Sequence, residues 1–214
     1  NVSNFMSHLA RGNTALSVTL TAVATLMAVV MTPLNFQFWG SLYPPARELL
    51  QTVRIEGWEM VRLVGLLLGL PVILGMALGH WRPDWARRTA RIFKKASLAF
   101  FAILVVLALW KDRSVFESYV GYVFGIVLIH NLLALSTGYG LARALRLPGP
   151  DTRTLALETG IQNSGLGLLL IFTFFGGLGG MALIAAFWGI WHLISGMLVA
   201  SLWSGLPLKK EQTI

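Results

Sequence analysis

Six long apolar runs take up most of this 214-residue chain and constrain its fold more than any other feature. Each run has about 20 residues or more, the length that a helix needs to cross the hydrocarbon core of a bilayer. Backbone groups in lipid must be hydrogen-bonded within their own segment, so the runs predict an all-α, polytopic membrane protein. The runs cover residues 15–33 (tailing on to 39), 60–79, 92–110, 119–145, 155–175 and 180–203.

The composition excludes several other classes of protein. Hydrophobic residues make up 56% of the chain and charged residues 12%, against about 25% charged residues in an average soluble domain. The chain has no cysteine, which excludes disulfides, thiolate metal sites and cysteine nucleophiles. Since no constellation of a nucleophile with a base is present either, we expect no enzymatic activity.

The charges are distributed unevenly between the two sides of the predicted membrane protein. Residues 80–95 carry six basic side chains, which predicts that this loop lies in the cytoplasm. Strict alternation then places residues 143–153, including Arg153, and the C-terminus inside, with 12 basic and 3 acidic residues on this side against 5 and 5 outside. The net charge of +8 therefore predicts an orientation in the cell (inner) membrane and not a nucleic-acid partner.

Glu158 is the one charged residue of 26 that these loops do not contain. A carboxylate at membrane depth costs at least about 2.5–3.5 kcal/mol on insertion scales, and we expect no buried lysine or arginine to pair with it. Its neighbours Gly160, Asn163, Gly165 and Gly167 predict a broken helix with free backbone carbonyls. Together with side-chain oxygens of Gln162 and Asn163, these groups suit a hard cation such as Na⁺. Alternatively, a protonated Glu158 bonds to a neighbouring helix and the glycines allow close packing.

A second set of oxygen-bearing side chains lies near the start of the chain. Ser3 and Asn4 precede a row of hydroxyls at spacings of three and four residues, namely Thr14, Ser17, Thr21 and Thr25. This spacing places the row on one face of a helix, where it could complete an oxygen site. Alternatively, these side chains bond to their own backbone or pack as small residues. The two regions are weakly alike, which is typical of inverted repeats.

Five more polar residues fall inside the predicted spans. They are His130, Asn131, Ser136, Thr137 and His192. Their spacing matches no metal site, and we expect isolated histidines at such positions to be packing residues more often than ligands.

The two polar segments resemble motifs of the bile acid:sodium symporter family. Residues 3–18 are similar to its first crossing motif, and Glu158-Thr-Gly-Ile-Gln-Asn-Ser-Gly-Leu is similar to its second. The resemblance implies two inverted five-helix repeats, a panel domain, a core domain and two crossing discontinuous helices. Residues 1–40 would then hold the second half of helix four and helix five of the core, residues 58–110 panel helices six and seven, and residues 117–204 core helices eight to ten, with a broken helix at 155–175. Because the chain begins at Asn1 and not at Met, we expect the preceding helices of the same protein to be missing.

The same resemblance implies which residues bind ions and substrate. One Na⁺ would be bound by Ser3, Asn4, Ser17, Thr21 and Glu158. A second Na⁺ would be bound by Glu158, the carbonyls of Thr159 and Ile161, and Gln162, with a further ligand on a helix that this chain lacks. Asn163 and His192 would contact the substrate.

The resemblance also implies an activity, which is sodium-coupled symport of an organic anion by alternating access. The anion would be a bile acid, a steroid conjugate or a small carboxylic acid. Two alternatives remain open, which are proton coupling through Glu158 and a membrane protein that binds an anion without transporting it.

Overall fold

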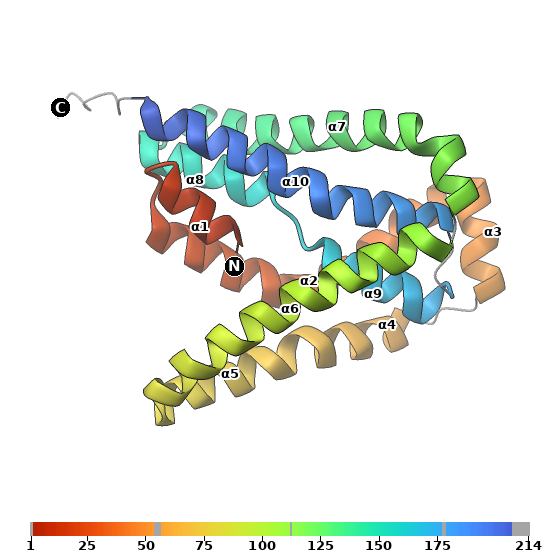
Figure 1. Cartoon of the computed structure of the whole chain (residues 1–214), viewed down its shortest axis with the longest axis horizontal. Helices are drawn as coiled ribbons and strands as arrows, with labels where there is room; N and C mark the ends of the chain where they lie inside the picture. The colour runs from red at the N-terminus through yellow and green to blue at the C-terminus, as the bar shows by residue number, and fades with distance from the viewer. Residues whose placement is uncertain (1, 54–56, 112, 177–178, 207–214) are drawn as a thin grey trace. The chain divides into compact units, whose positions relative to one another are not determined.

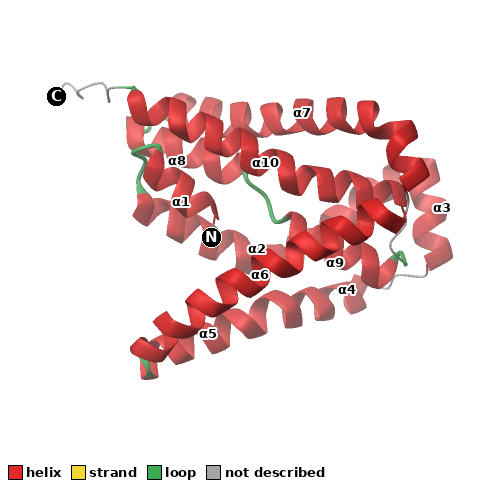
Figure 2. Cartoon of the chain, viewed as in Figure 1, coloured by secondary structure: helices red, strands yellow, loops and turns green. Residues whose placement is uncertain are grey.

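The computed structural model describes residues 2–53, 57–111, 113–176 and 179–206, and these are almost entirely helical (Figures 1 and 2). Within these ranges there is no strand. The helices are α1 (Val2–Leu9), α2 (Thr14–Leu42), α3 (Pro44–Val53), α4 (Gly57–Val64), α5 (Leu70–Trp81), α6 (Pro83–Lys111), α7 (Arg113–Ala144), α8 (Gly149–Gly160), α9 (Ser164–Phe174) and α10 (Gly179–Gly205). A π-helical turn, η1 (Gly65–Gly69), joins α4 to α5, so that these three elements form one continuous span.

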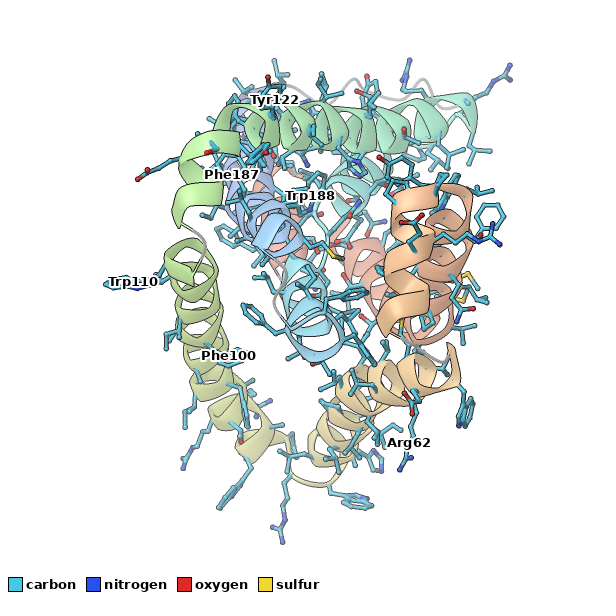
Figure 3. All side chains as sticks on the ribbon, turned by 90° about the vertical axis from the view of Figure 1, so that its right-hand side faces the viewer. Arg62, Phe100, Trp110, Tyr122, Phe187 and Trp188 are labelled. Atoms are coloured by element: carbon cyan, nitrogen blue, oxygen red, sulfur yellow. The ribbon has the colours of Figure 1, made fainter. Side chains whose placement is uncertain are left out.

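Five of the described helical segments are long and apolar enough to cross a membrane, which confirms the prediction of a polytopic all-α membrane protein. They are Thr14–Leu42, Trp58–Trp81, Glu117–Ala144, Gly149–Phe174 and Gly179–Gly205. The remaining predicted run, 92–110, is helical within α6, although many of its side chains fall outside the described part of the chain. Large apolar side chains stay exposed, as in Trp110, which is 83% exposed and projects away from the ribbon in Figure 3. Such surfaces suit lipid better than water.

The chain divides into two compact units. The first comprises residues 1–21 and 104–214, and the second comprises residues 22–103. In the first unit α7 packs along α8 and α10, and α1 packs on both α8 and α10. One buried cluster joins α1, α8 and α10 through Met6, Leu157 and Ala200, and another joins α7 to α10 through Val127 and Leu183.

Close packing of α7 on α8 depends on Gly138. A Cβ atom at this position would lie 2.6 Å from Thr159 Oγ1 and 2.7 Å from the carbonyl oxygen of Leu155. Both distances are shorter than a Cβ tolerates, so only glycine permits this approach. The contact positions α7 directly against the last turn of α8.

The helical path is interrupted between α8 and α9. Helix α8 ends at Gly160, and Ile161 has an extended backbone conformation. Helix α9 begins at Ser164, where the Asn163 side chain accepts a hydrogen bond of 3.1 Å from the amide of Leu166 as an N-cap. Asn163 therefore acts in the way that N-cap residues do, by satisfying an amide that has no partner within the helix.

Candidate cation site

A tight turn places α1, α2 and the start of α8 together in the first unit. Gly12 fits because a Cβ there would lie 2.6 Å from Thr154 Oγ1. The side chain of Asn13 accepts a hydrogen bond from the amide of Leu16 at 3.1 Å and donates one to Asp151 Oδ1 at 2.8 Å. Asn13 thereby caps α2 and joins it to α8, so that the next turns of both helices face each other.

Four side chains from these three helices meet one or two turns further along. Ser17 Oγ contacts Glu158 Oε1 and lies 2.9 Å from Asn4 Oδ1. Thr21 Oγ1 lies 2.9 Å from Glu158 Oε2 and 3.0 Å from Asn4 Oδ1. The two hydroxyls of α2 therefore each lie between the carboxylate on α8 and the amide oxygen on α1.

Each close contact between two oxygens needs a hydrogen atom to be a hydrogen bond, and this cluster has more such contacts than hydrogen atoms. Each hydroxyl carries one hydrogen, while an amide oxygen and an ionised carboxylate only accept. Four contacts therefore share two hydrogens, and two contacts bring lone pairs together. Protonation of Glu158 would supply a third hydrogen and still leave one contact without any. A cation among these oxygens would compensate the deficit.

The orientation of the Asn4 amide decides how many hydrogens the cluster has. With Oδ1 turned to Ser17 and Thr21, as the structure has it, the cluster is a set of oxygens that suits a hard cation. If the amide turned over, its two N–H groups would donate to the same hydroxyls and every contact would hold a hydrogen. The same side chains therefore suit two states. In one they surround a cation with oxygens, and in the other they are fully hydrogen-bonded to one another.

A fifth oxygen of the predicted set belongs to Ser3, which precedes Asn4 on α1. The Ser3 side chain is buried, and its Oγ has no hydrogen-bond partner among the described residues. A buried hydroxyl without a partner costs about 1–3 kcal/mol. An ion that accepts its lone pair would remove that cost.

Arg153 corrects the expectation that it belongs to a cytoplasmic loop. It lies in α8, is 8% exposed, and is not a loop residue. Its Nη1 donates to the carbonyls of Ala10 and Trp203 at 2.9 Å each, and its Nη2 to the carbonyl of Leu206 at 3.3 Å. These acceptors end α1 and α10, where the helix dipole is negative, so the guanidinium is bonded to carbonyls and not to Glu158.

The second predicted ligand set lies at the end of α8. Because α8 ends at Gly160, its last carbonyls, including that of Thr159, have no amide partner within the helix. The Thr159 hydroxyl bonds instead to the carbonyl of Leu155 at 2.7 Å. Ile161 is half-buried and Gln162 is exposed.

The two predicted substrate residues lie apart in the chain and differ in burial. Asn163 is exposed at the break, where it caps α9. His192 on α10 is 4% exposed, and its Nδ1 has no hydrogen-bond partner among the described residues. Trp188, one turn earlier, packs edge-on against His130 and also has an unpartnered ring nitrogen within the described part.

One buried polar pair was not predicted as part of any site. Asn131 on α7 donates to the carbonyl of Gly160 at 2.8 Å and accepts a hydrogen bond from Ser195 on α10. Sequence reasoning assigned Asn131 no role beyond that of a polar residue inside a span, because its partner at the break is a backbone carbonyl, which leaves no signal in the sequence.

Comparisons with known proteins connect this geometry to one group of transporters. The profile of the Sodium Bile acid symporter family matches residues 1–118. The uncharacterized sodium-dependent transporter YocS of Bacillus subtilis is 30% identical over 210 residues, which are 98% of this chain and 62% of that protein. The ileal sodium/bile acid cotransporter of Homo sapiens is 30% identical over 167 residues, 77% of this chain and 45% of that protein.

A plant relative extends the range of described substrates. The probable sodium/metabolite cotransporter BASS1, chloroplastic, of Arabidopsis thaliana is 29% identical over 202 residues, 94% of this chain and 48% of that protein. These relatives are sodium-dependent transporters and not enzymes, as the sequence predicted. The chain spans between 45% and 62% of the length of these three curated relatives.

Proposed function

Because this chain belongs to the sodium bile acid symporter family, we propose that it forms part of a sodium-coupled symporter of an organic anion. The observation that carries this proposal is the cluster of Asn4, Ser17, Thr21 and Glu158, in which four oxygen contacts share two hydrogens. A cation fills that deficit. Uptake of the anion would then be driven by the Na⁺ gradient.

Two ions are proposed, and both contact Glu158. The first is bound by Ser3, Asn4, Ser17, Thr21 and Glu158, which the cluster and the unpartnered Ser3 hydroxyl support. The second is bound by Glu158, Gln162 and the carbonyls of Thr159 and Ile161, which the end of α8 at Gly160 supports. Because both ions share one carboxylate, binding of either ion would change the affinity for the other.

The transport mechanism is alternating access between a core and a panel domain. That the ion ligands all belong to one compact unit, residues 1–21 and 104–214, supports an ion-binding core, whose proposed bounds differ from those of the unit within α2 and near residue 104. The core would hold residues 1–40 and 117–204, and the panel residues 58–110. Inverted repeats would relate the half-helix α1 and the long helix α2 to the half-helix α9 and the long helix α10. The preceding helices of the same protein would complete the second ion site.

The substrate is proposed to be a bile acid, a steroid conjugate or a small carboxylic acid. The names of the relatives, which describe bile acids and metabolites, support this range. Asn163 at the break and His192 on α10 would contact it, and the unpartnered Nδ1 of His192 supports that role. The proposed location is the cell membrane, with the C-terminus in the cytoplasm, as the basic loops favour.

The test is uptake of labelled taurocholate and pantoate by vesicles that contain the whole product of the gene. Uptake should require Na⁺ and stop when choline replaces it at constant pH. A Glu158→Ala variant that keeps Na⁺-dependent uptake would overturn the proposal. Saturable binding of either anion without accumulation would instead indicate a binding protein.

Proton coupling is a second candidate, and one observation favours it. A protonated Glu158 supplies the cluster with one of its two missing hydrogens. Full uptake in choline, driven by an inward proton gradient and lost in Glu158→Ala, would establish this mechanism over sodium coupling.

A further inference from the structure

Asn131 bridges the break in the α8–α9 helix to α10. Its Nδ2 donates to the carbonyl of Gly160 at 2.8 Å, and its Oδ1 accepts a hydrogen bond from Ser195 Oγ. Asn131 is 1% exposed and Ser195 is 9% exposed. A buried amide with both ends bonded to different helices is held in one orientation.

The Gly160 carbonyl needs this partner because of where it lies. Gly160 is the last residue of α8, so its carbonyl has no amide within the helix to accept from. The position is also buried, and a Cβ there would overlap the side chain of Leu135 on α7. The residue is therefore packed against α7, and the Asn131 amide of that helix supplies the partner that the carbonyl lacks.

Fixing one peptide at the break also orients the peptides beside it. The carbonyl of Gly160 points to α7, and the flanking carbonyls belong to Thr159 and Ile161. Since each peptide is planar and only two dihedral angles separate neighbouring peptides, a fixed Gly160 carbonyl restricts where the flanking carbonyls point. Loss of the Asn131 bond would remove this restriction.

We propose that Asn131 is a positioning residue for the second sodium ion, a role that rests on the proposed function. Asn131 acts through the Gly160 carbonyl and presents the carbonyls of Thr159 and Ile161 to the ion without touching it. Ser195 orients the Asn131 amide, because its hydroxyl donates to Oδ1 and leaves Nδ2 to face the break. Helices α7 and α10 therefore both hold the break in its unwound form.

The test compares three variants of the whole gene product in a Na⁺-driven uptake assay. Asn131→Leu keeps the side-chain shape and removes the N–H group that donates to Gly160. Ser195→Ala removes only the hydroxyl that donates to Asn131 Oδ1. The control is Thr137→Val on the same helix, where the exposed hydroxyl bonds to its own helix at the carbonyl of Leu133. The readouts are the Na⁺ concentration for half-maximal uptake, the Hill coefficient, and the ratio of Na⁺-driven to Li⁺-driven uptake.

We expect Asn131→Leu to raise the half-maximal Na⁺ concentration by about tenfold or more and to lower the Hill coefficient from about 2 towards 1. Ser195→Ala should raise that concentration by about two- to fivefold, and Thr137→Val should leave it unchanged. A changed Na⁺-to-Li⁺ ratio would mark altered ion coordination, since reduced stability alone would lower only the amount of protein.

Three outcomes separate this inference from the function on which it rests. Wild-type values for all three readouts in Asn131→Leu would overturn the positioning role while leaving sodium coupling intact. If Asn131→Leu does not fold, an unchanged Na⁺ dependence in Ser195→Ala would overturn it. Uptake by the wild type that does not depend on the Na⁺ concentration would overturn the proposed function and, with it, the positioning role.

Discussion

The hydroxyl of Thr21 lies 2.9 Å from the carboxylate oxygen Oε2 of Glu158, although 137 residues separate them in the chain. Ser17, one turn earlier on α2, contacts the other carboxylate oxygen. Glu158 is thus held by two successive turns of one helix, and Asn4 on α1 contacts both hydroxyls. A carboxylate that is fixed on both oxygens has little freedom left, which suits an ion site whose geometry must be formed in advance.

Replacing Glu158 by glutamine should abolish Na⁺ binding. The amide keeps the shape, removes the negative charge and replaces one carboxylate oxygen by an N–H donor, which a cation cannot use as a ligand. We expect a loss of affinity of at least about 100-fold, since hydrogen bonds and contacts to a charged group are worth about 1.5–3 kcal/mol each. Binding of ²²Na⁺ to the purified protein measures this, and Glu59→Gln, at an exposed position of α4, is the control. Equal ²²Na⁺ binding in Glu158→Gln and Glu59→Gln would contradict the assignment.

Thr21→Val should weaken Na⁺ binding and leave the fold intact. The substitution preserves the branched shape and replaces the oxygen that lies between Glu158 and Asn4 with a methyl group. We expect about tenfold weaker binding from the loss of one oxygen ligand. Thr19→Val is a matched control two residues away, because Thr19 is exposed and its hydroxyl bonds to the carbonyl of Ala15 on its own helix. Similar affinities in both variants would exclude the Thr21 hydroxyl as a ligand.

Arg153→Met should destabilise the first unit. The substitution removes three hydrogen bonds to carbonyls that end α1 and α10, and it leaves the carbonyl of the buried residue Ala10 without this donor. The expected loss is about 3 kcal/mol of unfolding free energy, since an unsatisfied buried group costs about 1–3 kcal/mol. Thermal unfolding in detergent measures it, with Arg143→Met at an exposed site in the last turn of α7 as the control. A melting temperature equal to that of the control would show that Arg153 does not join these helices.

Gly138→Ala should disturb the contact between α7 and α8. The new methyl group would lie 2.6–2.9 Å from atoms of Thr159, Leu155 and Ala156, two of which are backbone atoms. Overpacking of this kind costs about 1–3 kcal/mol. Gly121→Ala is the control on the same helix, because nothing lies within 4 Å of its Cβ position, and it should stabilise the helix by about 0.5–1 kcal/mol. Stabilisation by both substitutions would contradict the close approach.

The residues that the sequence predicted and those that it missed differ in the kind of partner they have. Glu158 was found because all other charges fit loops, and Ser17 and Thr21 because their spacing places them on one helical face. These three residues bond to side chains of the predicted cluster. Each therefore belongs to a pattern that the sequence displays.

Arg153 and Asn131 belong to no such pattern. Arg153 follows a polar stretch that contains proline, and a positive charge there is typical of a cytoplasmic loop. Its acceptors, and the acceptor of the Asn131 amide, are backbone carbonyls at helix ends. Any residue supplies such a carbonyl, so neither role could be predicted without knowing where the helices end and pack.

Asn4→Asp should strengthen cation binding, because it prevents the four side chains from satisfying one another by hydrogen bonds without a cation. In the wild type, the Asn4 amide can turn and donate two hydrogens to Ser17 and Thr21, which competes with the ion. An aspartate has no hydrogens to donate when ionised, and it adds a second negative charge beside Glu158. We expect about tenfold tighter ²²Na⁺ binding, and slower uptake because release of the ion becomes unfavourable. Asn4→Leu should weaken binding instead, since it removes the oxygen that contacts both hydroxyls. If both variants bound Na⁺ with the affinity of the wild type, Asn4 would not be a ligand of the ion. It would also not belong to a hydrogen-bonded network that competes with ion binding.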